Sequence, residues 1–155
     1  MNKLIVISIF SLLALGLEGQ TISKKQTELI KNQVDSVFQK MVVYAEKLDF
    51  EKLSLGVDDT YNTGFISNNK YYSQYASLIE DTKLTALGIS KQDISIKEKK
   101  ITVLSDKIVI LTATGTAKSY IDDGREILIN FHWSFVYEKI DNNWKVIQSH
   151  QSGVR

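Results

Sequence analysis

The side chains best suited to acid–base chemistry near neutral pH are the two histidines of the chain. His132 lies in the aromatic run FHWSFVY at positions 131–137, and His150 lies in the final segment NNWKVIQSHQSGVR at positions 142–155. Apolar and polar residues alternate through both segments, which predicts two neighbouring β-strands. Whether either histidine can serve a site therefore depends on the face of the sheet that it occupies.

Side chains alternate between the two faces of a strand, so the turn between these strands decides which residues share a face. A two-residue turn at positions 141–142 or 142–143 places odd residues of the first strand with even residues of the second. One face then carries Phe131, Trp133, Phe135, Tyr137, Trp144, Val146, Gln148, His150 and Ser152. This face is the more apolar one and should be buried, so we predict that His150 points inward beside Trp133 and that His132 faces solvent.

An inward His150 has two interpretations, and both stay open. It is either a core histidine hydrogen-bonded to Ser152 or to a backbone carbonyl, or a pocket group that binds or protonates a ligand. In the second case Trp133 and Gln148, on the same face, are expected to contribute to the ligand site. No metal site is expected, because the chain has no cysteine and its histidines are predicted on opposite faces.

Tyrosines are the other candidates for a ligand site. Tyr44 lies on the apolar stripe of the first predicted helix, where its hydroxyl could enter a pocket; ordinary core packing is the alternative. Tyr61 is a second candidate, with packing of its amphipathic ring as the alternative. The adjacent carboxylates Asp58 and Asp59 could border a pocket or belong to a solvated loop.

The sequence pattern argues against several other functions. Ser149 and His150 are adjacent and point to opposite faces, so they cannot act as nucleophile and base. The chain contains no glycine-rich phosphate loop, and no cofactor is expected. A net charge of +1, and an aromatic stripe without basic residues between its rings, give no reason to expect nucleic acid as a partner.

The elements that position these residues form one domain with helices first and strands second, an α+β arrangement. A capping box at positions 23–26 begins a long amphipathic helix that extends to Lys47, and Asp49 begins a short second helix. A third helix is predicted over positions 68–88, and its inward stripe would include Tyr72, Tyr75, Leu78, Ile79 and Thr82. From Asp93 onward, period-two patterning and three turns predict four antiparallel strands. The apolar, buried face of one strand would consist of Val109, Leu111, Ala113, Gly115 and Ala117.

The N-terminus has the pattern of a secretory signal peptide. Lys3 precedes an apolar run from Leu4 to Leu15, and Gly19 supplies a small residue before Gln20. A membrane anchor is the alternative, but the run is shorter than the roughly 20 residues that span a bilayer. We expect residues 1–19 to be removed and the remainder to be exported, to the periplasm or outside the cell, with no membrane attachment afterwards.

The order of elements resembles that of a known family: three predicted helices are followed by a meander of long strands. The meander ends with the segment WSFVYEKIDNNWKVIQSHQS at positions 133–152. The chain resembles the SnoaL-like group of the nuclear transport factor 2-like superfamily, and the association domain of calcium/calmodulin-dependent kinase. The resemblance covers positions 23–153. It implies a cone-shaped, curved antiparallel sheet wrapped around the long first helix, with two further short helices and a conical cavity. Asn142 departs from the glycine common in this turn, but asparagine tolerates the same left-handed conformation.

The resemblance also implies what the domain does. We expect it to bind a small, partly apolar molecule in the cavity and to form a homodimer through the outer face of the sheet. One alternative is an isomerase or cyclase type of enzyme that uses His150 as acid or base. The other is a dimerisation or assembly module without chemistry. The last two strands place no aspartate or glutamate on the inward face, which weighs against an enzyme.

Overall fold

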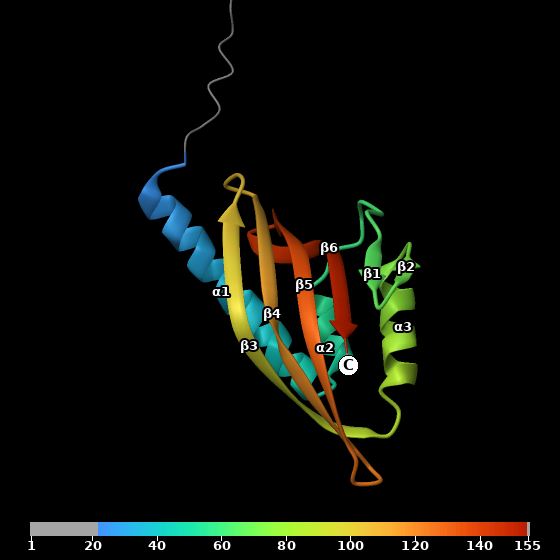
Figure 1. Cartoon of the computed structure of the whole chain (residues 1–155). Coiled ribbons are helices and arrows are strands. Elements are labelled where there is room, and N and C mark those ends of the chain that lie inside the picture. Colours follow the sequence, from blue (N-terminus) through green and yellow to red (C-terminus); the bar gives the residue numbers. More distant parts are fainter. Residues whose placement is uncertain (1–21, 155) are drawn as a thin grey trace, which may run out of the picture.

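The computed structural model describes residues 22–154 (Figure 1). The predicted signal peptide at positions 1–19 lies outside the described residues. The elements are α1 (Lys24–Glu46), α2 (Phe50–Leu55), β1 (Phe65–Ser67), β2 (Lys70–Tyr72), α3 (Tyr75–Thr85), β3 (Ile89–Val103), β4 (Ile108–Ile121), β5 (Glu126–Ile140) and β6 (Asn143–Val154). Within this range no helix has the length and apolarity that crossing a membrane would require.

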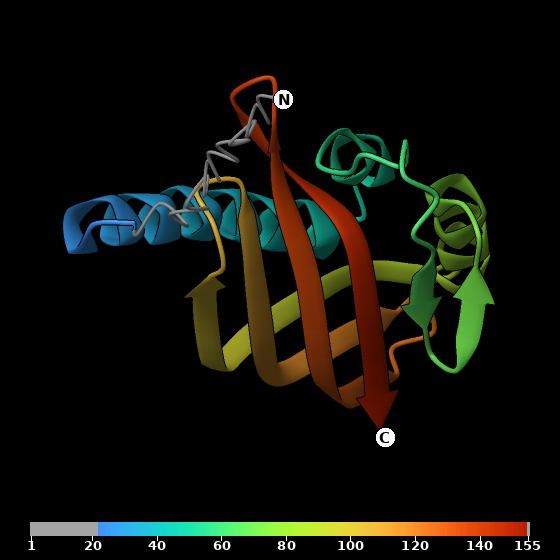
Figure 2. The same cartoon turned by 90° about the horizontal axis from the view of Figure 1, so that it is seen from above.

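The strands form one six-stranded mixed sheet in the order β2-β1-β6-β5-β4-β3. All neighbours are antiparallel except β1 and β6, which are parallel. The sheet curls without closing, and α1 crosses its concave side (Figure 2). The predicted α+β cone around a long first helix is therefore confirmed.

The long first helix forms where the sequence predicts it, because its N-terminus is capped and one face is continuously apolar. Ser23 accepts a hydrogen bond from the backbone amide of Gln26 at 3.2 Å, which satisfies one of the free amides of the first turn. The residues that face the sheet recur at helical spacing and are buried: Ile30, Val34, Phe38 and Val42.

The prediction for the third helix is wrong in its first third, positions 68–74. Residues 65–72 form the β1–β2 hairpin, and α3 begins only at Tyr75. The turn of the hairpin is Asn68-Asn69, and both residues have positive φ, 48° and 66°. Two consecutive left-handed residues join tightly paired strands, and asparagine tolerates that conformation better than most residues. Local turn chemistry therefore overrides the helical spacing of the apolar residues here.

The register between β4 and β5 confirms the predicted buried face of β4. Leu111 pairs with Phe135, Ala113 with Trp133 and Gly115 with Phe131. The small residues of β4 lie opposite the aromatic rings of β5, which leaves room for the rings on the concave side of the sheet. Gly115 is required by this packing, because an added Cβ would overlap the backbone carbonyl of Ser95 on β3.

The register between β5 and β6 corrects the prediction for His150. Val136 pairs with Gln148, but its neighbour Tyr137 pairs with Val146, so Ile147 is an extra residue in β6. A β-bulge of this kind adds one residue to the strand, so every side chain beyond it points to the opposite face from the one that simple alternation predicts. His150 therefore pairs with Ser134 on the convex face and is exposed, and Ser149 takes the inward position with 1% of its surface exposed.

Candidate functional site

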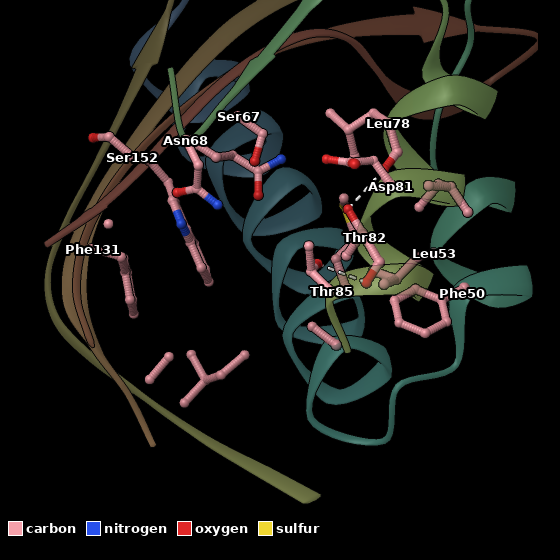
Figure 3. Close-up of a pocket in the computed structure, with 18 of the residues that line it drawn as sticks. Phe50, Leu53, Ser67, Asn68, Leu78, Asp81, Thr82, Thr85, Phe131 and Ser152 are labelled. Carbon is pink, nitrogen blue, oxygen red and sulfur yellow. Dashed lines mark hydrogen bonds between the residues drawn. The ribbon is translucent and has the colours of Figure 1, made fainter. Parts of the chain in front are cut away.

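A cavity of about 420 Å³ lies on the concave side of the sheet, between β5 and α3. Helices α1 and α2 also line the cavity. The residues are Phe38, Met41, Val42 and Ala45 from the C-terminal half of α1, and Phe50 and Leu53 from α2. Figure 3 shows Phe131 facing the labelled residues of α3 across the open space. The fold therefore builds the cavity predicted for the cone, from residues far apart in the sequence.

One wall of the cavity is aromatic, because every second residue of β5 points to the concave side. The rings of Phe131 and Trp133 are stacked, with centroids 3.8 Å apart and an interplanar angle of 13°. Trp133 meets Phe135 edge to face at a centroid distance of 6.1 Å. Phe131 and Phe135 are buried, whereas Trp133 keeps part of its surface accessible. The wall thus offers a rigid, flat surface to a ligand.

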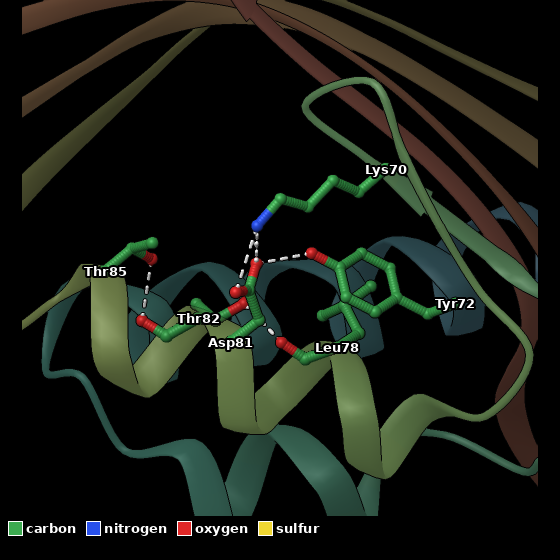
Figure 4. A network of polar contacts seen from close by, with 6 residues as sticks. All are labelled: Lys70, Tyr72, Leu78, Asp81, Thr82 and Thr85. Carbon is green, nitrogen blue, oxygen red and sulfur yellow. Dashed lines mark hydrogen bonds and ion pairs between the residues drawn. The ribbon is translucent and has the colours of Figure 1, made fainter.

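The opposite wall carries a polar network centred on Asp81 of α3 (Figure 4). Its carboxylate accepts a hydrogen bond of 2.5 Å from the Tyr72 hydroxyl. The Lys70 ammonium donates to both carboxylate oxygens, at 3.0 and 3.1 Å. Lys70 and Tyr72 are the two ends of β2, and their side chains reach across to the helix that follows. All three residues line the cavity.

This network shifts the protonation equilibria of its members. The hydrogen bond from Tyr72, together with that from Lys70, lowers the pKa of Asp81 below its ordinary value. The hydrogen bond that the Tyr72 hydroxyl donates to Asp81, together with partial burial, raises the pKa of Tyr72 to about 12. At neutral pH Asp81 is therefore a carboxylate, Tyr72 is a neutral donor and Lys70 is a cation. A carboxylate with a lowered pKa is a weaker base than an ordinary one.

Further polar groups border the same space. Thr82 and Thr85 of α3 line it, but their hydroxyls donate to the Leu78 and Thr82 carbonyls at 2.7 and 3.0 Å. The side chains of Asn68 and Gln151 also reach the cavity. The Gln151 amide donates to the Ser149 hydroxyl at 3.3 Å, and its carbonyl oxygen can accept from a ligand.

The structure brings one of the five predicted site residues, Trp133, to the cavity. Gln148 and His150 lie on the convex face because of the bulge at Ile147, so the inward orientation predicted for them is wrong. Whether Trp133 contacts a ligand stays a prediction.

The two predicted tyrosines lie elsewhere. Tyr44 is half-buried beside α2, where the Lys52 ammonium lies 5.8 Å from its ring centroid. Tyr61 is 57% exposed and donates to Glu138 at 3.2 Å. Neither side chain lines the cavity.

Sequence reasoning missed Lys70 and Asp81. The predicted inward stripe of the third helix did include residues that line the cavity, namely Tyr72, Tyr75, Leu78, Ile79 and Thr82. Asp81 lies between two members of this stripe and could have been found by asking which polar neighbours share its face. Lys70 carried no such signal, because it reaches the site from a hairpin that had been predicted as helix.

Among residues 22–154, no three histidine, cysteine or acidic side chains are grouped so that they could hold a metal ion.

A curved sheet that encloses a cavity with one long and two short helices defines a nuclear transport factor 2-like α+β cone, and solved structures support this class. A proposed dehydratase of that family from Streptomyces avermitilis superposes with a TM-score of 0.72 at 16% identity, over 83% of this chain and 99% of that chain. A nuclear transport factor 2-like superfamily protein from Salmonella enterica serovar Typhimurium superposes with a TM-score of 0.71 at 18% identity, over 83% of this chain and 94% of that chain. The association domain of calcium/calmodulin-dependent protein kinase II from C. elegans superposes with a TM-score of 0.65 at 14% identity, over 81% of this chain and 96% of that chain.

The sequence identifies the family within this class. The family model for the calcium/calmodulin dependent protein kinase II association domain matches residues 69–155, more than half of the chain. The chain belongs to this family. No curated protein matches the chain.

Proposed function

We propose that this domain binds a small, partly apolar molecule in the cavity between β5 and α3. The observation that carries the proposal is the cavity itself, about 420 Å³ in volume, with an aromatic wall facing a few convergent polar groups. Small-molecule sites are of this size and character, since apolar walls supply affinity and a few polar groups fix orientation.

The same residues favour binding over acid–base catalysis. Proton transfer at neutral pH is most efficient with a group whose pKa lies near 7, and histidine supplies such a group most often. Over the described range 22–154, no histidine lines the cavity, and the carboxylate that does line it, Asp81, has a lowered pKa. An enzyme that used His150 as acid or base in the cavity would need that side chain on the concave face, whereas it lies on the convex face.

The proposal can be tested with a neutral fluorescent probe, N-phenyl-1-naphthylamine, whose emission rises in apolar sites. Ala117 of β4 lines the cavity, so Ala117→Phe should fill part of it and abolish the emission gain. Ala76 of α3 is exposed and outside the lining, so Ala76→Phe is the matched control and should bind as the wild type does. Equal binding by both variants, or no binding by the wild type, would contradict the proposal.

Assembly is a second candidate function, and membership of an association-domain family favours it. The convex face of β5 and β6 is where we propose that a second copy pairs. This face presents half-buried Val136 and exposed Leu128 beside short polar side chains. Ligand binding on the concave side and pairing on the convex side are compatible.

Export is the third part of the proposal, and it rests on the sequence pattern of residues 1–19 alone. A domain without cysteine depends on no disulfide, so its fold is compatible with either side of a cell membrane.

A further inference from the structure

We propose that Lys70 and Asp81 set the charge selectivity of the cavity, so that it takes uncharged, planar molecules whose hydroxyl, carbonyl or amide group faces this ion pair. The inference rests on the proposed function, because it names the class of ligand that the same cavity binds. It adds a role for two residues at the rim, which act on the ligand through their charges.

The charges that border the cavity cancel. Lys70 and Asp81 are the charged side chains among the lining residues of the described chain, and their ammonium and carboxylate groups lie 3.0 Å apart. A charged ligand would find the protein group of opposite charge already paired, with a group of the same charge as the ligand next to it. An uncharged ligand meets neither cost, so the pair favours it over both an anion and a cation of the same shape.

The pair can still satisfy the polar end of an uncharged ligand. An ammonium group has three donors, and two of those on Lys70 go to the two oxygens of Asp81. The third can donate to a hydroxyl or carbonyl oxygen. The Oδ1 atom of Asp81 accepts from Lys70 alone, whereas Oδ2 also accepts from Tyr72, so Oδ1 can accept from a ligand hydroxyl or amide.

The preference for a planar molecule comes from the opposite wall. The rings of Phe131 and Trp133 are stacked face to face, so buried Phe131 supports one side of the Trp133 ring, and the flat surface of the wall is the accessible part of Trp133. A ring that lies against this surface gains offset stacking, which a branched aliphatic ligand of equal volume lacks. Figure 3 shows that Phe131 and Asp81 border the cavity from opposite sides, so a flat ring can meet the aromatic wall while its polar group meets the pair.

Tyr72 is a positioning residue in this arrangement. Its hydroxyl holds the carboxylate of Asp81 toward Lys70, and it lowers the pKa of that carboxylate. Asp81 therefore stays ionised, and the charges stay cancelled, across the neutral pH range.

The experiment compares three probes that share a naphthalene ring and differ in charge: 2-naphthol, which is neutral, 2-naphthoate, an anion, and 2-(aminomethyl)naphthalene, a cation. Their affinities are measured at pH 7 by displacement of N-phenyl-1-naphthylamine. Lys70→Met removes the cation and leaves Asp81 unpaired, and Asp81→Asn does the reverse. The double variant removes both charges. Lys83→Met and Glu80→Gln remove the same charges from exposed positions of α3 outside the lining and serve as matched controls.

The wild type should bind 2-naphthol more tightly than either charged probe, by roughly fivefold, the scale expected for a partly solvated ion pair. Lys70→Met should raise the ratio of cation to anion affinity by a similar factor, and Asp81→Asn should lower it. The double variant should again prefer 2-naphthol, and the two controls should keep the wild-type ratios.

Two different failures are distinguishable. If the wild type binds neither the reporter nor any naphthalene probe, the proposed function is contradicted. If the wild type binds them but takes a charged probe as tightly as 2-naphthol, the selectivity inference is overturned without any variant. Unchanged ratios in folded Lys70→Met and Asp81→Asn would overturn it as well.

Discussion

Replacement of Gly115 by alanine should be among the most damaging single-methyl changes in this domain. Gly115 lies in the middle of β4, where β3 and β5 pack on either side. An added Cβ would overlap the backbone carbonyl oxygen of Ser95 and lie 2.7 Å from Cζ of Phe131. A side chain can rotate away from a new methyl group, but a carbonyl in a paired strand cannot, so β3 has to separate from β4.

The expected loss follows from two opposing effects. Overpacking that moves backbone destabilises by about 1–3 kcal/mol, and the upper end applies here because the overlap is with backbone. Alanine also reduces the conformational entropy of the unfolded chain, which stabilises the folded state by roughly 0.4–1 kcal/mol. The net loss in the free energy of unfolding is therefore about 2 kcal/mol. Because Phe131 must also shift, affinity for N-phenyl-1-naphthylamine should fall in the same variant.

Guanidinium unfolding followed by tryptophan fluorescence measures the effect, and Gly56→Ala is the control. There φ is −81°, which alanine adopts freely, and the nearest atoms to the new methyl group would be the Leu53 carbonyl oxygen at 3.3 Å and Cγ of Met41 at 3.6 Å, so the loss should be much smaller. A loss below about 0.5 kcal/mol for Gly115→Ala, or equal losses for the two variants, would refute the packing described for β3, β4 and β5.

Four further predictions concern the histidines, the polar network, assembly and export. His132→Ala and His150→Ala, compared by denaturant unfolding at low protein concentration, should each change stability by less than about 0.5 kcal/mol, because both side chains are exposed; a large loss for His150→Ala alone would contradict the bulge in β6. The pKa of Tyr72 is raised from 10.0 to about 12, so its stabilising hydrogen bond is fully present below about pH 10 and is lost as the pH rises through 12. Thermal melts across this range should therefore show the advantage of the wild type over Tyr72→Phe disappearing, and an advantage that persists at high pH would count against the hydrogen bond. Light scattering should give the mass of a homodimer, whereas a monomer mass at micromolar concentration argues against pairing through the convex face. N-terminal sequencing of exported protein should start at or near Gln20, and an intact Met1 in the membrane fraction would rule out cleavage.

Local periodicity determined most of the fold. The spacing of Ile30, Val34, Phe38 and Val42 predicts the helix that the sheet wraps, and it is observed as α1. Period-two alternation predicts the four long strands, and the apolar face of β4 is the buried one. These features depend on neighbours within one turn or one strand pair, so the sequence carries them without knowledge of distant contacts.

The face of His150 depended on information that the sequence does not carry. Both turn registers considered for the β5–β6 hairpin assume unbroken pairing, and pairing holds from Ile140↔Asn143 to Tyr137↔Val146. Ile147 then adds one residue to β6, and every side chain beyond it changes face. Ile147 looks like any strand residue in the sequence. The bulge lies next to Val146, which bonds to residues 56–58 as well as to β5, and those distant partners are not visible in the local pattern.

The candidate site was likewise decided by tertiary structure. Trp133 could be assigned to the cavity from the alternation along β5, since parity within one strand needs no partner. Lys70, Tyr72 and Asp81 come together only because the Asn68-Asn69 turn folds β2 back beside α3, so that a strand and the helix after it face one cavity. Hydrogen bonds between side chains of different elements depend on how those elements pack, and packing is set by the whole core rather than by the spacing of residues along the chain.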